Sequence, residues 1–138
     1  MTARPMLSII AVATDGSETA GHAVDAAFDL AERFGAGVVV LTAFSAARGD
    51  AGGWRANEAT RAERVLADAV EAAEARGLTC SSAMLEGDPA EVLVALAARH
   101  GADLLVVGNK GMERRVLGSV PNTVTHRAPC SVFVVKTV

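Results

Sequence analysis

Short apolar runs alternate with amphipathic segments along the whole chain. The amphipathic segments place small and apolar residues at helical spacing, as Ala23, Ala27 and Ala31 illustrate. The apolar runs have the length of β-strands and are rich in Val, Ile and Leu, which is typical of parallel strands covered by helices on both faces. The pattern therefore predicts a parallel α/β sandwich. Its five expected strands are Leu7–Ala13, Val38–Leu41, Leu78–Leu85, Asp103–Val107 and Ser131–Lys136.

Turn and capping residues mark the ends of the four expected helices. Asp88-Pro89-Ala90-Glu91 combines an acidic cap, a proline at the first helical position and a glutamate. Gly35, Gly77 and Gly101 lie where helices should end. The run 78–85 is more polar than the others and is expected near a sheet edge. We expect helices over about 20–34, 54–76, 89–100 and 120–128, with a mobile loop over 44–53.

Composition fits one small domain spanning residues 1–138. Half of the residues are hydrophobic (51%) but only 4% are aromatic, so Ala, Val and Leu must fill the core. The net charge of −3 argues against a general nucleic-acid binder. Cys80 and Cys130 lie far apart and outside any CxxC pattern, which favours a reduced, cytoplasmic setting.

The first residues imitate a secretory signal peptide. Arg4 precedes the short apolar run 6–13, which ends in an A-x-A pattern. Signal peptides usually run for about 15–30 residues, and cleavage here would remove the expected first strand. We therefore interpret this run as a core strand. No other segment has the length that a membrane span needs.

A glycine-rich loop is the strongest chemical signal in the sequence. Gly108-Asn109-Lys110-Gly111 follows the fourth expected strand, and Gly118-Ser119 precedes the fourth expected helix. Strand, glycine-rich loop and helix N-terminus together favour a phosphate site, because free backbone N–H groups point at the anion. Lys110, Arg114 and Arg115 would neutralise phosphate charge, or they are solvated loop residues. Alternatively, the glycines only make tight turns.

Asp15 and Ser119 each have two interpretations. Asp15 follows the first strand, where it could cap the next helix with help from Glu18, or accept hydrogen bonds from a ribose or adenine. In open parallel sheets, ligands bind beyond the carboxyl ends of the strands, so Asp15 and Gly108 are expected in one cleft. Ser119 could cap the fourth helix or donate its hydroxyl to a phosphate.

No catalytic arrangement is evident, and the sequence gives no positive case for an enzyme. His22, His100 and His126 lie on different helices or helix ends, without metal-ligand spacing. A slow ATPase would need a carboxylate near the γ-phosphate, for which Glu113 is the nearby candidate. The last strand, 131–136, is apolar on both faces and expected at a sheet edge, which suggests a homodimer through this strand.

These features together resemble the universal stress protein family. The resemblance covers nearly the whole chain: IIAVATDGS, then GDPAEVLVALAARHGADLLVVGNKG, and GSVPNTVTHRAPCSVFVVK at the end. It implies a five-stranded parallel sheet of order 3-2-1-4-5 with two helices on each face. It also implies a homodimer formed through strand five.

The resemblance to the ATP-binding branch of that family implies a set of nucleotide-binding residues. Positions around Asp15 and Ala43 would hold the adenosine end. The glycines and Ser119 would hold the phosphates of ATP, or of AMP or cyclic AMP, with magnesium accompanying ATP. The implied set is Thr14, Asp15, Ala43, Val107, Gly108, Asn109, Lys110, Gly111, Gly118, Ser119 and Val120.

One departure from the family pattern concerns the glycine loop. Six residues separate Gly111 from Gly118, where the family pattern has nine. The charged residues of this shorter segment would replace lost backbone donors, or the phosphate site is reduced. The resemblance implies an ATP-binding, dimeric stress-response regulator. The alternatives are a nucleotide-free protein-interaction module, with a protein partner that the sequence does not identify, and a slow ATPase.

Overall fold

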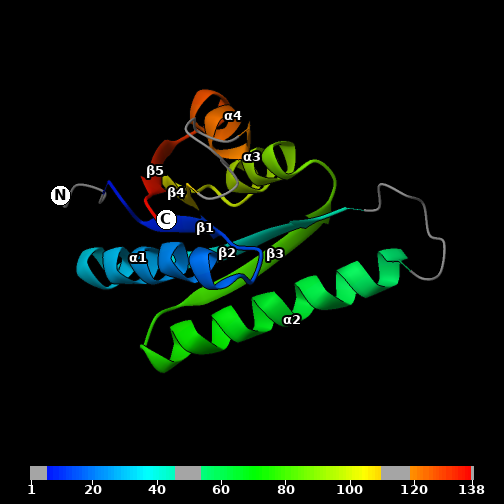
Figure 1. The fold of residues 1–138 in the computed structure, drawn as a ribbon. Coiled ribbons are helices and arrows are strands. Elements are labelled where there is room, and N and C mark those ends of the chain that lie inside the picture. Colours follow the sequence, from blue (N-terminus) through cyan, green and yellow to red (C-terminus); the bar gives the residue numbers. More distant parts are fainter. Residues whose placement is uncertain (1–5, 46–53, 110–118, 138) are drawn as a thin grey trace.

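The computed structural model describes residues 6–45, 54–109 and 119–137 and has the predicted architecture. Five parallel strands form one sheet in the order β3-β2-β1-β4-β5, which confirms the expected order (Figure 1). The elements are β1 (Ile9–Ala13), α1 (Glu18–Phe34), β2 (Gly37–Phe44), α2 (Trp54–Ala75), β3 (Cys80–Glu86), α3 (Pro89–Arg99), β4 (Leu104–Gly108), α4 (Ser119–Arg127) and β5 (Ser131–Val135).

Two hydrophobic clusters, one on each face of the sheet, hold the layers together. Alternate residues of β1 point to opposite faces, so Ile10 packs with α1 and α2 while Ala11 packs with α3 and α4. Phe28 is the largest buried side chain on the first face, and Leu105 is fully buried on the second. The expected pair of helices on each face is therefore confirmed.

Pairing with β3 makes β2 longer than its apolar run suggests. The register of these two strands continues to Phe44, which lies opposite Glu86. Thr42, Ala43 and Phe44 are therefore strand residues. The expected loop over 44–53 is thus wrong at Phe44, and its residues 46–53 lie outside the described part of the chain.

Helix ends follow local chemistry, with one correction. Asp88 caps α3 as expected, because its side chain accepts a hydrogen bond from the backbone N–H of Glu91 at 3.1 Å. The interpretation of Asp15 as the cap of α1 is wrong. Ser17 caps that helix instead, since its hydroxyl oxygen accepts the N–H of Ala20 at 3.1 Å. The reason is a turn at Gly16 that starts the helix two residues later.

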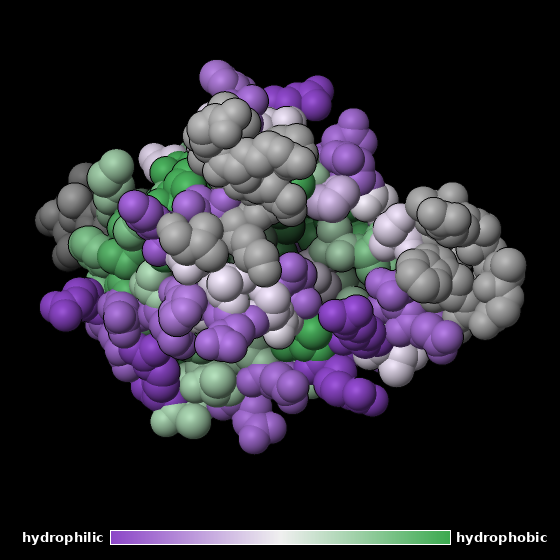
Figure 2. All heavy atoms as spheres, viewed as in Figure 1, coloured by the Kyte–Doolittle hydropathy of each residue, from purple (hydrophilic) through white to green (hydrophobic). Residues whose placement is uncertain are grey.

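Both predicted edge strands lie at the edges of the sheet. β3 has mostly exposed or half-exposed residues, and β5 leaves 41% of Phe133 exposed. In Figure 2, apolar surface gathers over β5 at the left of the view, while the α1 and α2 side is largely hydrophilic. An apolar parallel edge strand is suited to pairing with another chain. In the described ranges, no helix has the length and apolar character needed to cross a bilayer.

Arg76 joins the C-terminal ends of α1 and α2. Its guanidinium lies 2.5 Å from Asp29 Oδ1, contacts both carboxylate oxygens of Glu32, and stands 5.5 Å from the centre of the Phe28 ring. The hydrogen bond from Arg76 holds the pKa of Glu32 below its usual range. Three interactions thus converge on one side chain, so Arg76 is a specific link between two helices of the same layer.

We expect Arg76→Ala to lower the melting temperature at pH 7, with a difference from wild type that shrinks in acid. The folded pKa of Glu32 is depressed, so its stabilising contribution is present above the ordinary value of 4.5 and is lost as the pH falls below it. Thermal melts at pH 7 and pH 3 would measure this. Arg61→Ala, an exposed change on α2, is the matched control. A difference that stays constant with pH would contradict the assignment.

Candidate functional site

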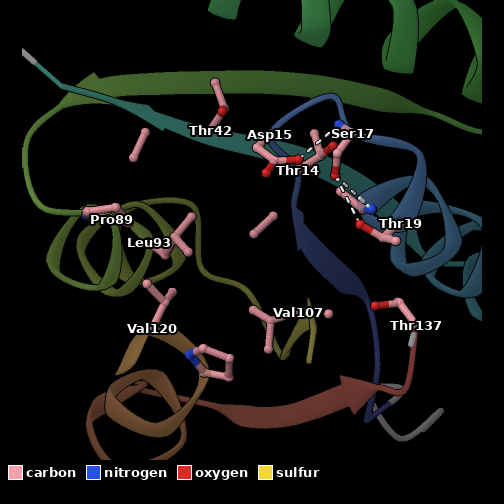
Figure 3. Close-up of a pocket in the computed structure, with 15 residues that line it drawn as sticks. Thr14, Asp15, Ser17, Thr19, Thr42, Pro89, Leu93, Val107, Val120 and Thr137 are labelled. Atoms are coloured by element: carbon pink, nitrogen blue, oxygen red, sulfur yellow. Dashed lines mark hydrogen bonds between the residues drawn. The ribbon is translucent and has the colours of Figure 1, made fainter. Parts of the chain in front are cut away.

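A cavity of about 320 Å³ opens at the carboxyl ends of the strands. It lies between the ends of β1, β2 and β4 and the first turns of α1, α3 and α4 (Figure 3). The chain passes from β1 to β2 in one direction across the sheet, and from β4 to β5 in the opposite direction. The strand order therefore reverses between β1 and β4, which is the point of a parallel sheet where ligands usually bind. The cavity is lined by Ala13, Thr14, Asp15, Ser17, Thr19, Ala20, Thr42, Ala43, Pro89, Leu93, Val107, Gly108, Val120, Pro121 and Thr137.

The turn from β1 to α1 is fixed by its own hydrogen bonds. Thr14 donates its backbone N–H to the carbonyl of Leu41 at 3.0 Å, and its hydroxyl oxygen accepts the N–H of Gly16 at 3.1 Å. Asp15 Oδ1 accepts the N–H of Ser17 at 2.9 Å. Gly16 has a φ of +83°, which favours glycine. This turn therefore sets the position of the Asp15 carboxylate at the cavity.

Three helices begin at the cavity, and the N-terminal end of each helix dipole carries a partial positive charge. α1 and α3 carry an acidic residue in the first turn, Glu18 and Glu91 respectively, and Asp88 also caps α3. These carboxylates offset the partial charge of their helix ends. α4 has no acidic residue in its first turn, and Val120 and Pro121 of that turn line the cavity. The α4 end is therefore best suited to an anion.

Among the described residues that line the cavity, Asp15 is the only one with a charged side chain. Its carboxylate repels anions and accepts hydrogen bonds from hydroxyl or amino groups. The rest of the lining is apolar or carries a hydroxyl, as at Thr14, Ser17, Thr19 and Thr42. The cavity can thus hold a molecule with an apolar or aromatic part, several polar groups, and an anionic end near α4.

The structure brings six of the sequence-predicted residues together. Asn109 is not among the residues that line the cavity, because its side chain is bound to Thr137. Lys110, Gly111 and Gly118 lie outside the described part of the chain, and Ser119 is described only as the first residue of α4. The six residues that line the cavity are Thr14, Asp15, Ala43, Val107, Gly108 and Val120.

Several lining residues were missed from the sequence. Thr42 carried a usable signal, because it is a polar residue in an otherwise apolar run, directly before Ala43. Pro89 and Leu93 lie one helical turn apart at the start of α3, and a helix that follows a parallel strand must begin at this edge of the sheet. Thr137 follows the last strand and carried no signal, since only tertiary structure brings it beside Gly108.

Metal and thiol chemistry find no support in the described ranges. No three His, Cys, Asp or Glu side chains come together there as a metal site would need. Burial raises the pKa of the Cys80 thiol to about 11 and raises that of Cys130 as well. Both cysteines are therefore poor nucleophiles at neutral pH. They lie near opposite edges of the sheet, on β3 and just before β5, and neither is in a disulfide.

Comparison with known proteins supports the resemblance noted in the sequence. The model of the universal stress protein family matches residues 6–136. The universal stress protein Rv1636 of Mycobacterium tuberculosis is 35% identical over an alignment of 143 positions, which covers 93% of this chain and 95% of that protein.

Two solved structures share both the fold and about a third of the sequence. One is a universal stress protein in complex with cAMP, which is 32% identical with a TM-score of 0.81; the match covers 96% of this chain and 99% of that one. The other, from Burkholderia pseudomallei, is a universal stress protein family member that is also 32% identical with a TM-score of 0.81. That match covers 96% of this chain and 98% of the other. The sequence match along nearly the full chain and the shared strand order lead to one conclusion: this chain belongs to the universal stress protein family.

Proposed function

We propose that this protein binds an adenine nucleotide, ATP, in the cavity at the carboxyl ends of β1, β2 and β4. The observation that carries the proposal is that Asp15 and the N-terminus of α4 line the same cavity. A carboxylate that accepts hydrogen bonds and a helix end that attracts an anion match the two ends of a nucleotide. A cavity of about 320 Å³ also has the size of a small-molecule site.

The charges of the site orient the ligand. Phosphate is repelled by Asp15, so the adenosine end lies near Asp15 and Ala43. The phosphates then extend past Gly108 toward the first turn of α4. The sequence predicts Lys110, Gly111, Gly118 and Ser119 as their further contacts. Magnesium would be carried mainly by the phosphates of ATP. The related universal stress protein that was solved in complex with cAMP supports an adenine ligand.

We further propose a regulatory role for a homodimer in the cytoplasm, where the two thiols stay reduced. The dimer would form through β5, whose apolar edge is partly exposed at Phe133. Nucleotide binding at the carboxyl ends of β1, β2 and β4 would alter the surface that this dimer offers to a protein partner.

We expect calorimetry at millimolar ligand to give heat with ATP, AMP or cyclic AMP, and a raised melting temperature with the same ligand. Guanine nucleotides are the matched control, because they keep the phosphates but exchange the base. A native mass spectrum of the purified protein would report bound nucleotide and dimer mass together. The absence of both heat and thermal shift with every adenine ligand would overturn the proposal.

The six-residue spacing between Gly111 and Gly118 favours a second candidate, a protein-interaction module that binds no nucleotide. Replacing Gly118 with leucine separates the two functions. A nucleotide site would lose affinity because the side chain fills the space of a phosphate. An interaction module would keep its partner binding in the folded variant.

A further inference from the structure

Three hydrogen bonds tie Asn109, which directly follows β4, to the last residue of β5 and to Thr137 just beyond it. The backbone N–H of Asn109 donates to the carbonyl of Val135 at 2.9 Å. Asn109 Oδ1 accepts the backbone N–H of Thr137 at 2.8 Å and the Thr137 hydroxyl at 3.0 Å. The Asn109 side chain thus fixes both the backbone and the side chain of Thr137.

These bonds determine where the hydroxyl proton of Thr137 points. The atom of Asn109 that receives a backbone N–H must be the amide oxygen, because the amide nitrogen cannot accept. An amide oxygen only accepts, so the Thr137 hydroxyl must be the donor in its own bond to Asn109. With its proton so engaged, the Thr137 oxygen can only accept a further hydrogen bond.

Thr137 is also a wall of the cavity. Figure 3 shows its side chain at the end of β5, with the hydroxyl oxygen directed toward the interior of the cavity. Its methyl carbon lies 3.4 Å from the position that a β-carbon on Gly108 would occupy. This is an ordinary van der Waals separation, so Thr137 lies directly beside Gly108 and the two residues form one surface.

We propose that Thr137 is a specificity residue that accepts a hydrogen bond from a sugar hydroxyl of the ligand, and that Asn109 is its positioning residue. This inference rests on the proposed nucleotide function. An oxygen that can only accept favours a ribose hydroxyl beside it and disfavours a phosphate oxygen. The ligand class that fits this wall is a ribonucleotide, with its sugar beside Thr137 and its phosphates further toward α4.

The test compares AMP with its 2′-deoxy and 3′-deoxy analogues by calorimetry. We expect the wild-type protein to prefer AMP over one of the analogues by roughly threefold to tenfold, the effect of one net hydrogen bond. Thr137→Val keeps the shape and removes the acceptor, so the preference should disappear, whereas Thr137→Ser should keep it. Thr125→Val is the matched control, because it makes the same change at an exposed hydroxyl on α4, which donates to the carbonyl of Asn122 and is not among the described residues that line the cavity.

Variants at Asn109 test the positioning role separately. Asn109→Ala frees the Thr137 hydroxyl, so the preference for AMP should fall even though Thr137 is intact. Asn109→Asp retains an acceptor for both bonds and should preserve the preference. A structural defect alone would weaken all three ligands equally and leave their ratio unchanged.

The outcomes separate this inference from the function on which it rests. If the wild-type protein binds no adenine ligand, the proposed function is overturned and this inference with it. If AMP binds but the wild-type protein does not discriminate against either analogue, this inference alone is overturned. The same holds if Thr137→Val keeps the full preference.

Discussion

Replacing Gly16 with alanine is expected to lower the free energy of unfolding by about 2–4 kcal/mol. Gly16 has a φ of +83°, a conformation that a β-carbon strains. The added carbon would also lie 2.6 Å from Val65 Cγ2 on α2, a separation that real side chains do not adopt. Both costs act on the turn that positions Asp15. Urea denaturation of the purified variant would measure the loss, and nucleotide affinity should fall with it.

Gly21→Ala is the matched control for that substitution. Gly21 lies inside α1, without a positive φ, and no described neighbour outside the backbone of its own helix lies within 4 Å of its would-be β-carbon. Alanine there should stabilise the helix by about 0.5–1 kcal/mol. The double variant Gly16→Ala with Val65→Ala relieves the contact and leaves the backbone strain, so its loss should be smaller than the sum of the two single losses. A Gly16→Ala protein as stable as wild type would refute this account of the turn.

Asp15→Asn is expected to weaken adenosine and ATP binding by roughly tenfold to hundredfold, the range for a hydrogen bond to a charged group. The change keeps the oxygen that accepts the N–H of Ser17, so the turn should survive. It removes the negative charge that the proposal assigns to the nucleoside end. Calorimetry with both ligands would measure the loss, and the factor should be similar for the two because the phosphates lie elsewhere.

The control for Asp15→Asn is Asp25→Asn, which makes the same chemical change on the exposed face of α1 and outside the cavity. Its affinity should match that of the wild-type protein. An Asp15→Asn variant that folds normally and binds both ligands with unchanged affinity would remove Asp15 from the site. A loss for ATP alone would place Asp15 near the phosphates and reverse the proposed orientation.

Local sequence patterns predicted most of the fold because the same residues that favour a strand or cap a helix locally also bound these elements in the folded protein. Apolar runs made the strands, and Asp88 with Pro89 marked the start of α3. Gly77 and Gly101 end helices with φ values of +78° and +65°, as the sequence suggested. Asp15 was misjudged as a cap because Ser17, two residues later, offers the same chemistry, and sequence alone does not rank two neighbouring candidates.

The candidate site, too, was predictable from local sequence patterns only in part. Asp15 and Gly108 were predictable because each lies at the end of a parallel strand, and those ends meet at one edge of the sheet. Ala43 came from the resemblance, because the apolar run that predicted β2 stops at Leu41. Strand order itself came from the resemblance, since periodicity does not say which strands are neighbours.

The sequence by itself determined the strands, the helices and the strand ends that carry Asp15 and Gly108. The reason is that hydrophobic periodicity and helix capping depend on residues only a few positions apart. Only the tertiary structure decided that Thr137 forms a wall of the cavity and that the amide oxygen of Asn109 holds Thr137 in place. It also decided that Val65 of α2 crowds Gly16. These contacts join residues that are far apart in the chain, and their partners are chosen by the packing of the sheet.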